Sequence, residues 1–123
     1  MRTTLILLAL AVALPCAAAE PSKVDEAFGN TIISTYPDGR MAELWLAADG
    51  SYTAQGRRHD PSRGHWRVTD GKMCLKQSHP LAFGITYCVP LPAGGLHESW
   101  TGKAYTGEAI TIHLAQGHVV PGR

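Results

Sequence analysis

The chain has few residues of the kinds that carry catalysis or hold cofactors. Its 123 residues include 3 cysteines and 2 phenylalanines, and 11 basic side chains nearly balance 10 acidic ones. The sequence contains no glycine-rich phosphate loop, no G-x-S-x-G elbow and no H-x-x-x-H pair. A formal net charge of +1 supplies no global field to steer the chain toward nucleic acid or an anionic membrane. We therefore expect a non-enzymatic protein with no cofactor, no metal and no nucleic-acid partner.

Long hydrophobic runs are also missing, except at the start of the chain. Leu5–Leu14 forms an apolar run of about ten residues, which is too short to span a bilayer as a helix. A proline ends this run, and small residues follow at positions 17–19. This layout predicts a secretory signal peptide over residues 1–19 with cleavage before Glu20. Lipidation of Cys16 is the alternative, and the proline directly before this cysteine argues against it.

Removal of residues 1–19 leaves residues 20–123, the length of one domain with a single modest core. Arg2 leaves with the signal peptide, so ten of the 11 basic residues remain against 10 acidic ones. No second apolar run follows. We expect a periplasmic or secreted protein that does not insert into a membrane.

The number of cysteines becomes even once the signal peptide is removed. Cys74 and Cys88 then remain, and an even count in an exported chain favours a disulfide. Two buried free thiols are less compatible with an oxidising compartment. A metal pair is a further alternative, although two cysteines fourteen positions apart lack the C-x-x-C spacing of zinc sites.

Alternating apolar and polar residues predict strands between positions 63 and 91. Asp70-Gly71 supplies the backbone freedom for a two-residue hairpin turn. Both cysteines fall on the polar face of their strands, so that an antiparallel register can place Cys74 directly opposite Cys88. The same register brings two apolar pairs together, Leu75 with Tyr87 and Met73 with Val89.

The rest of the chain reads as short strands separated by turns. About eight strands predict an all-β fold, a small antiparallel up-and-down barrel or half-open barrel, with a sandwich as the alternative. A short helix over Lys23–Phe28 would cover one end, and 116–123 would form a tail. The expected strands include Thr31–Tyr36, Arg40–Ala48, 51–55, Leu96–Thr101 and Ala109–Ala115. The expected core consists of Tyr52, Trp66, Val68, Leu75, Tyr87, Val89, Ile110 and Ile112.

Several short motifs in this pattern resemble a known family. Gly29-Asn30-Thr31, Asp49-Gly50, Gly64-His65-Trp66, Cys74 and Cys88 look like small secreted proteobacterial proteins that are classed as a domain of unknown function. This resemblance covers most of 29–89 and implies a periplasmic β domain. The G-x-W element with one disulfide is also similar to bacterial metalloprotease inhibitors, which are small eight-stranded barrels. That similarity implies an inhibitor-like binding protein.

Candidate functional residues are few. Six histidines are scattered, and only His113 and His118 could meet a metal, through the tail. Glu98 lies two residues from both Leu96 and Trp100, so in a strand it would share their face and would be the one candidate for an inward carboxylate. A basic cluster crowds the longest polar loop and the strand after it: Arg57, Arg58, His59, Arg63, His65 and Arg67. Such a cluster can bind an acidic partner or can be a solvated loop.

Two functions remain open at this point. The first is a non-enzymatic binding module for a protein partner, either inhibitor-like or associated with the cell envelope. The second is a small-molecule carrier with a ligand cavity inside the barrel, and metal handling is a remote third. The volume of the cavity distinguishes the first two. We expect the bulky side chains of Trp66, Tyr52 and Tyr87 to fill the barrel, which favours a protein partner.

Overall fold

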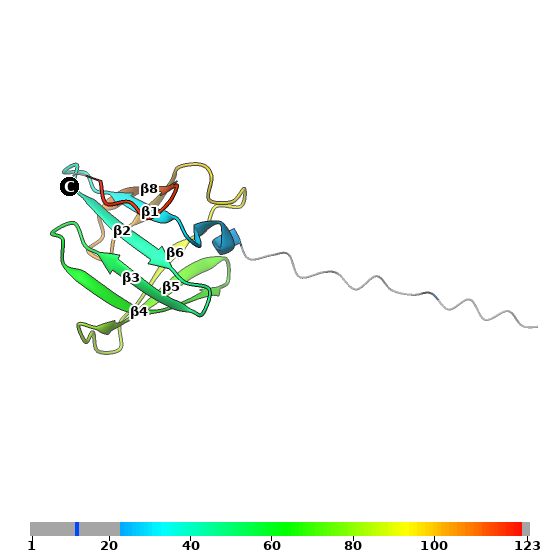
Figure 1. Ribbon diagram of the computed structural model, residues 1–123, viewed down its shortest axis with the longest axis horizontal. Coiled ribbons are helices and arrows are strands. Elements are labelled where there is room, and N and C mark those ends of the chain that lie inside the picture. The colour runs from blue at the N-terminus through cyan, green and yellow to red at the C-terminus, as the bar shows by residue number, and fades with distance from the viewer. Residues whose placement is uncertain (1–11, 13–22, 122–123) are drawn as a thin grey trace, which may run out of the picture.

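Eight antiparallel strands wrap into a nearly closed barrel (Figure 1). The computed structural model describes residue 12 and residues 23–121, so the predicted signal peptide lies outside the described residues. Within them no helix is long and apolar enough to cross a membrane. The strands are β1 (Thr31–Thr35), β2 (Met41–Leu46), β3 (Ser51–Gln55), β4 (Pro61–Thr69), β5 (Lys72–His79), β6 (Thr86–Pro90), β7 (Trp100–Lys103) and β8 (Ala109–Ala115).

The barrel is an up-and-down meander, which confirms the predicted fold class. Each strand pairs with its neighbour in sequence except across one seam, and β1 pairs with β8, so the sheet order is β6-β5-β4-β3-β2-β1-β8-β7. At the seam between β6 and β7, the Tyr87 hydroxyl donates a hydrogen bond of 2.6 Å to the Lys103 carbonyl. A side chain on Gly102 would meet Val89 Cγ2 at 2.8 Å, so the two edge strands approach closely. Among the strands of residues 23–121, these two edges are the ones left without a ladder.

The hairpins between β4 and β6 adopt the predicted register. Asp70 and Gly71 both have positive φ angles, 51° and 70°, as a two-residue turn of this hand requires. Cys74 lies opposite Cys88 and is bonded to it. The two apolar pairs fall where the alternation predicts them: Leu75 with Tyr87 and Met73 with Val89.

The segment before β1 closes one end of the barrel, as predicted, but it is a 3-10 helix rather than an α-helix. This helix, η1, spans Lys23–Ala27 and lies at the right-hand end of the barrel in Figure 1. Val24 and Ala27 are completely buried. Leu96 is also completely buried, although it belongs to the segment between β6 and β7 rather than to a strand.

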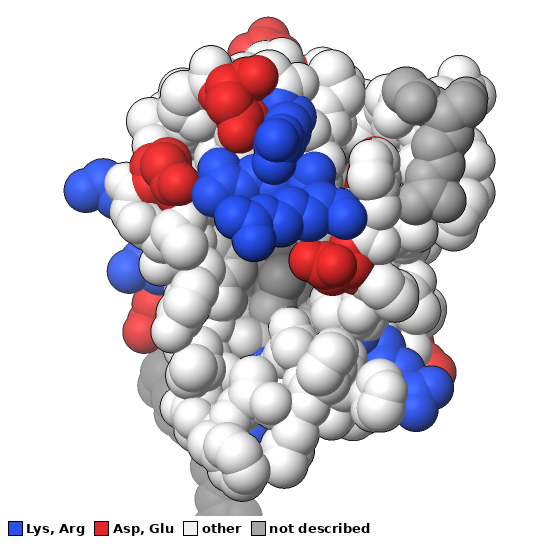
Figure 2. Space-filling view, turned by 90° about the vertical axis from the view of Figure 1, so that its left-hand side faces the viewer, with Lys and Arg blue, Asp and Glu red and all other residues white. Residues whose placement is uncertain are grey.

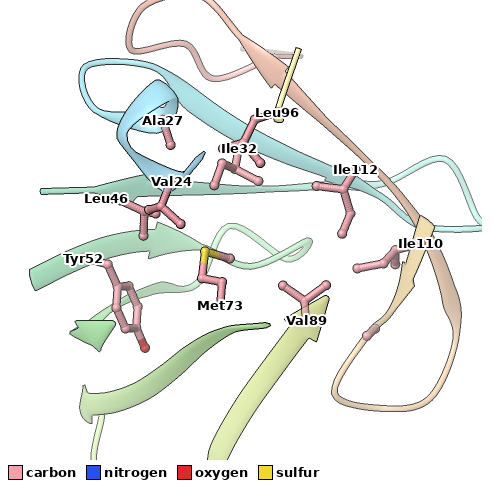
Figure 3. Packing of buried hydrophobic residues seen from close by; sticks show 11 residues of the cluster. Val24, Ala27, Ile32, Leu46, Tyr52, Met73, Val89, Leu96, Ile110 and Ile112 are labelled. Atoms are coloured by element: carbon pink, nitrogen blue, oxygen red, sulfur yellow. The ribbon is translucent and has the colours of Figure 1, made fainter. Parts of the chain in front are cut away.

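The core fills the half of the barrel next to η1 (Figure 3). Tyr52, Val89, Ile110 and Ile112 are buried as expected, and Met73, Ile32 and Leu46 join them. Other expected core residues are only partly buried against this cluster: Trp66, Leu75 and Tyr87.

Val68 is a wrong core prediction, since 41% of the residue is exposed. It lies near the far end of β4, beyond His65, which is opposite the first residue of β3. No residue of β3 therefore stands beside Val68, and its pair partner Met73 covers it on one side only. Val68 does share the inward face of β4 with Trp66, but burial also requires that the neighbouring strand β3 extend far enough to cover it.

The predicted ends of β1 and β2 differ from the observed ones by one or two residues, and the differences are larger at β4 and β7. β4 begins at Pro61, so the polar loop before it is shorter than expected. β7 covers Trp100–Lys103 instead of Leu96–Thr101. Leu96 turns into the core and accepts no strand pairing, while its backbone N–H donates to Glu26 Oε2 at 2.6 Å. Glu98 lies in a bend and is exposed, so it is not the inward carboxylate that its parity suggested.

Candidate functional site

The end of the barrel opposite η1 is open. Four connections surround this mouth, because in a meander every second connection lies at the same end: residues 36–40, 56–60, 80–85 and 104–108. Figure 2 looks onto the end of the molecule that lies at the left in Figure 1. A hollow lies below the gathered basic side chains there, and uncoloured side chains bound it on the lower side.

The hollow is the entrance of a cavity of about 330 Å³ inside the barrel. Four small inward residues create it, since alternation directs one small side chain from each of β1 to β4 into the open half. Ser34 lies opposite Ala42, and Ala54 lies opposite Ser62. The core half of the same strands carries Ile32, Leu46 and Tyr52 instead. The cavity therefore results from a change from large to small inward residues along each strand.

Aromatic and aliphatic side chains form the floor and the remaining wall. Tyr52 lines the floor, and Tyr87 lines the wall beside the seam. Leu44, Leu75 and Ile110 add apolar surface. The expectation that Trp66, Tyr52 and Tyr87 would fill the barrel is wrong. Trp66 lies at the closed end, where its ring is 5.7 Å from that of Phe28 and its indole N–H donates to the Ala47 carbonyl.

The side chains that face the cavity are uncharged. Glu43 borders the cavity, but Ala42 and Leu44 face inward, so alternation directs the Glu43 side chain to the outer face of β2, where it is buried with 2% of the residue exposed. The polar groups inside are the hydroxyls of serine and tyrosine and the Gln77 amide. Burial raises the pKa of the Tyr52 hydroxyl and that of Tyr87, so both stay neutral well into the alkaline range.

Arg57 lies on the rim and is held there by three contacts. Its guanidinium carbon is 4.4 Å from the centre of the Tyr36 ring. Its Nη2 is 3.2 Å from Glu108 Oε1, and its Nη1 is 3.9 Å from Asp38 Oδ2. A hydrogen bond from Thr106 and the neighbouring guanidinium lower the pKa of Glu108. Arg57 thus links the turn before β2 to the turn before β8 across the mouth.

The six predicted cluster residues do not form one surface. Arg57 is engaged at the rim, whereas Arg58 and His59 are exposed on the loop before β4. Arg63, His65 and Arg67 are exposed along the outer face of β4, because residues two apart share a face. Two basic neighbours on β5 were not included in the predicted cluster: Lys76 lies opposite His65, and Lys72 lies opposite Thr69. Alternation already assigns both lysines to the polar face of β5, but their place beside β4 follows only from the strand pairing.

The tail after β8 packs on the outer face of β1 and β2. The His118 ring stacks on the Trp45 ring at 4.2 Å. Thr31 Oγ1 donates to the Gly117 carbonyl and accepts from the Trp45 indole and the Val119 N–H. In the described part of the chain no group of three or more His, Cys, Asp or Glu side chains could hold a metal ion.

Comparison of the chain with protein-family models, with curated proteins and with solved structures found no match. The geometry of the barrel and its mouth therefore carries the functional argument by itself.

Proposed function

We propose that this protein is a non-enzymatic carrier that binds a small, neutral and mostly apolar molecule inside the barrel. One observation carries this proposal: an open cavity of about 330 Å³ is left where four strands change to small inward residues. Ligand pockets begin at about this size, and they are lined mainly by apolar and aromatic groups with a few polar ones. An eight-stranded barrel has room for one small ligand.

The lining sets the chemical class of the ligand. Leu44, Leu75 and Ile110 favour an apolar body, and the ring of Tyr52 offers a flat aromatic contact. Burying a charge without an opposite charge is costly, so an ionised group would have to stay at the rim. Ser34, Ser62 and Gln77 can each exchange one hydrogen bond with a hydroxyl, carbonyl or amide of the ligand.

A fluorescent probe tests the proposal on the chain without residues 1–19. N-phenyl-1-naphthylamine is neutral and apolar, and its emission rises when it leaves water. We expect a saturable rise with one probe bound per protein. Ala54→Trp fills the cavity from β3 and should weaken probe binding by about tenfold or more, because the new indole occupies the site.

Thr53→Trp is the matched control, since Thr53 is exposed on the outer face of the same strand. This variant should bind the probe as the natural chain does. Circular dichroism and a thermal melt establish that both variants are folded. Equal probe binding by Ala54→Trp and the natural chain would place the probe outside the barrel and would contradict the proposal.

An exported location is part of the proposal, and it rests on the Leu5–Leu14 run and the small residues after it. The N-terminus of protein recovered from the periplasm or the medium should be Glu20. An N-terminus at Met1 would contradict export by this route.

Binding of an acidic protein partner is the second candidate function. It is favoured by the exposure of Arg58, Arg63 and Arg67, which have no ion pair with an acidic side chain within the described residues. An inhibitor-like protein would use such a surface together with an exposed loop. Replacement of these three arginines by glutamine should then abolish capture of the partner from an extract.

A further inference from the structure

Exposed apolar side chains gather at the mouth of the barrel. The connection between β5 and β6 carries Leu81 and Phe83, which are 68% and 84% exposed, and Ile85, which is 40% exposed. Tyr105, in the turn between β7 and β8, is 67% exposed. Ile85 and Tyr105 also line the cavity, so that apolar surface continues from the interior to the rim. Apolar groups that remain exposed in this way indicate an interaction site.

The charges of this nearly neutral chain are segregated between the two ends of the barrel. The mouth and the strand ends beside it carry Arg40, Arg57, Arg58, Arg63 and Lys103 against Asp38, Asp60 and Glu108. The closed end carries Asp25, Glu26, Asp49, Asp70 and Glu98, and the basic residues Arg67 and Lys72 lie beside it. Net charge predicted no electrostatic steering, but a molecule with such a distribution turns its mouth toward an anionic surface.

Basic and apolar groups adjoin each other at one place on the rim. Arg63 lies opposite His79, the last residue of β5 before the loop that carries Leu81 and Phe83. This loop is tied back to the barrel, because Gln77 Nε2 donates to the Pro80 carbonyl at 2.7 Å and Ser78 Oγ donates to the Arg63 carbonyl. The first residue of the loop is therefore fastened to β5, next to the strand that carries Arg63.

We infer that the mouth rim docks on the surface of a lipid bilayer that contains anionic lipids. Leu81 and Phe83 enter the boundary between headgroups and acyl chains, and Arg58 and Arg63 lie against the lipid phosphates. This is the pattern of peripheral proteins, in which buried apolar area and attraction to anionic lipid add together. It faces the open cavity toward the membrane. The inference goes beyond ligand binding and stands without it, since it rests on the rim alone.

The shape of this rim fits the surface of a bilayer better than it fits the surface of a protein partner. A stable protein interface needs about 800 Å² of complementary surface on each side, with a well-packed apolar centre. Here the centre of the surface is the open cavity, and the apolar groups stand on separate connections around it. Fluid lipids adapt to an irregular rim of this kind, and the long arginine side chains reach headgroups without a fixed partner geometry.

Co-sedimentation with vesicles tests the inference on the chain without residues 1–19. We expect binding to vesicles of phosphatidylcholine and phosphatidylglycerol in equal parts, little binding to phosphatidylcholine alone, and loss of binding as salt rises. Arg58→Gln together with Arg63→Gln should weaken binding by about fivefold for each charge. Leu81→Ser together with Phe83→Ser should weaken it by about tenfold or more.

The closed end supplies matched controls. Arg67→Gln with Lys72→Gln removes two exposed charges from the same pair of strands, and Val68→Ser removes an exposed apolar side chain there. Both controls should bind vesicles as the natural chain does. Ala54→Trp should also keep full vesicle binding even though it loses the probe, so that failure of the carrier proposal and failure of the docking inference are separable.

Three outcomes would overturn the inference. They are no binding to the mixed vesicles by the natural chain, full binding by both rim variants, and equal weakening by rim and control variants. Capture of a protein that depends on Leu81 and Phe83, in a chain that does not bind the mixed vesicles, would assign the rim to a protein partner instead.

Discussion

Burial of one side chain at the floor of the cavity, that of Tyr52, predicts that the barrel loses stability at alkaline pH. Tyr52 is 5% exposed, and burial raises the pKa of its hydroxyl because the phenolate is poorly solvated there. In the unfolded chain a tyrosine ionises near pH 10. Its contribution to stability is therefore complete below about pH 10 and is lost as the pH rises toward the higher folded pKa.

Tyr52→Phe removes this contribution and little else, since the ring remains. We expect the natural chain to lose more free energy of unfolding than the variant when the pH rises from about 8 to about 11. Urea unfolding at the two pH values measures the difference. Tyr105→Phe, on the exposed rim, is the control and should follow the natural chain. Identical pH dependence of Tyr52→Phe and the natural chain would mean that the hydroxyl is solvated in the folded state.

At the scale of the strands, one glycine allows β4 and β5 to pair closely beside an irregularity. The register of the two strands shifts between Arg63 and Gly64, as at a β-bulge. A Cβ atom on Gly64 would lie 2.1 Å from the Lys76 carbonyl oxygen, a backbone atom that cannot rotate away. The glycine of the G-x-W motif is thus explained by a close approach of two backbones.

Gly64→Ala should therefore destabilise the barrel by about 3 kcal/mol, because the strands must separate to admit the methyl group. Gly94→Ala is the matched control, since nothing lies within 4 Å of the added Cβ there and its φ angle is not positive. The midpoint of thermal or urea unfolding measures both variants. A small effect at Gly64, similar to that at Gly94, would show that the bulge relaxes at little cost.

At the scale of the whole molecule, the disulfide supports the strand beside the open seam. β6 is an edge strand, paired on one side only with β5, and Cys88 fastens it to Cys74 of that neighbour. Across the seam the Tyr87 hydroxyl bond to the Lys103 carbonyl joins β6 to β7. Loss of the disulfide therefore weakens the attachment of the strand on which closure of the barrel depends.

Replacement of both cysteines by serine should lower the free energy of unfolding by about 3 kcal/mol, because the unfolded chain gains the freedom that the bridge removes. Reduction of the natural chain should reproduce this loss, and the intact mass should show two alkylatable thiols only after reduction. Equal stability of the double variant and the oxidised chain would mean that the hairpin holds the edge strand without the bridge.

Local pattern was sufficient for much of the fold. The Asp70-Gly71 turn predicted the hairpin of β4 and β5, and alternation together with the two cysteines predicted the register of β5 and β6. All of these signals depend on neighbours that are close in sequence. A side chain's face follows from its parity within the strand alone. The succession of hairpins then favoured an up-and-down meander, and about eight strands are enough to close a small barrel.

Tertiary structure decided which of the inward-facing residues are buried and which of them line the cavity. Val68 has inward parity but is exposed, because no residue of β3 stands beside it. Ser34, Ala42, Ala54 and Ser62 create a cavity only because pairing of four strands gathers them in the half of the barrel next to the mouth rather than at the plugged end. The charges of Arg63 and Asp70 belong to opposite ends for the same reason. Parity is a property of one strand, whereas depth along the barrel depends on the lengths and offsets of all its neighbours.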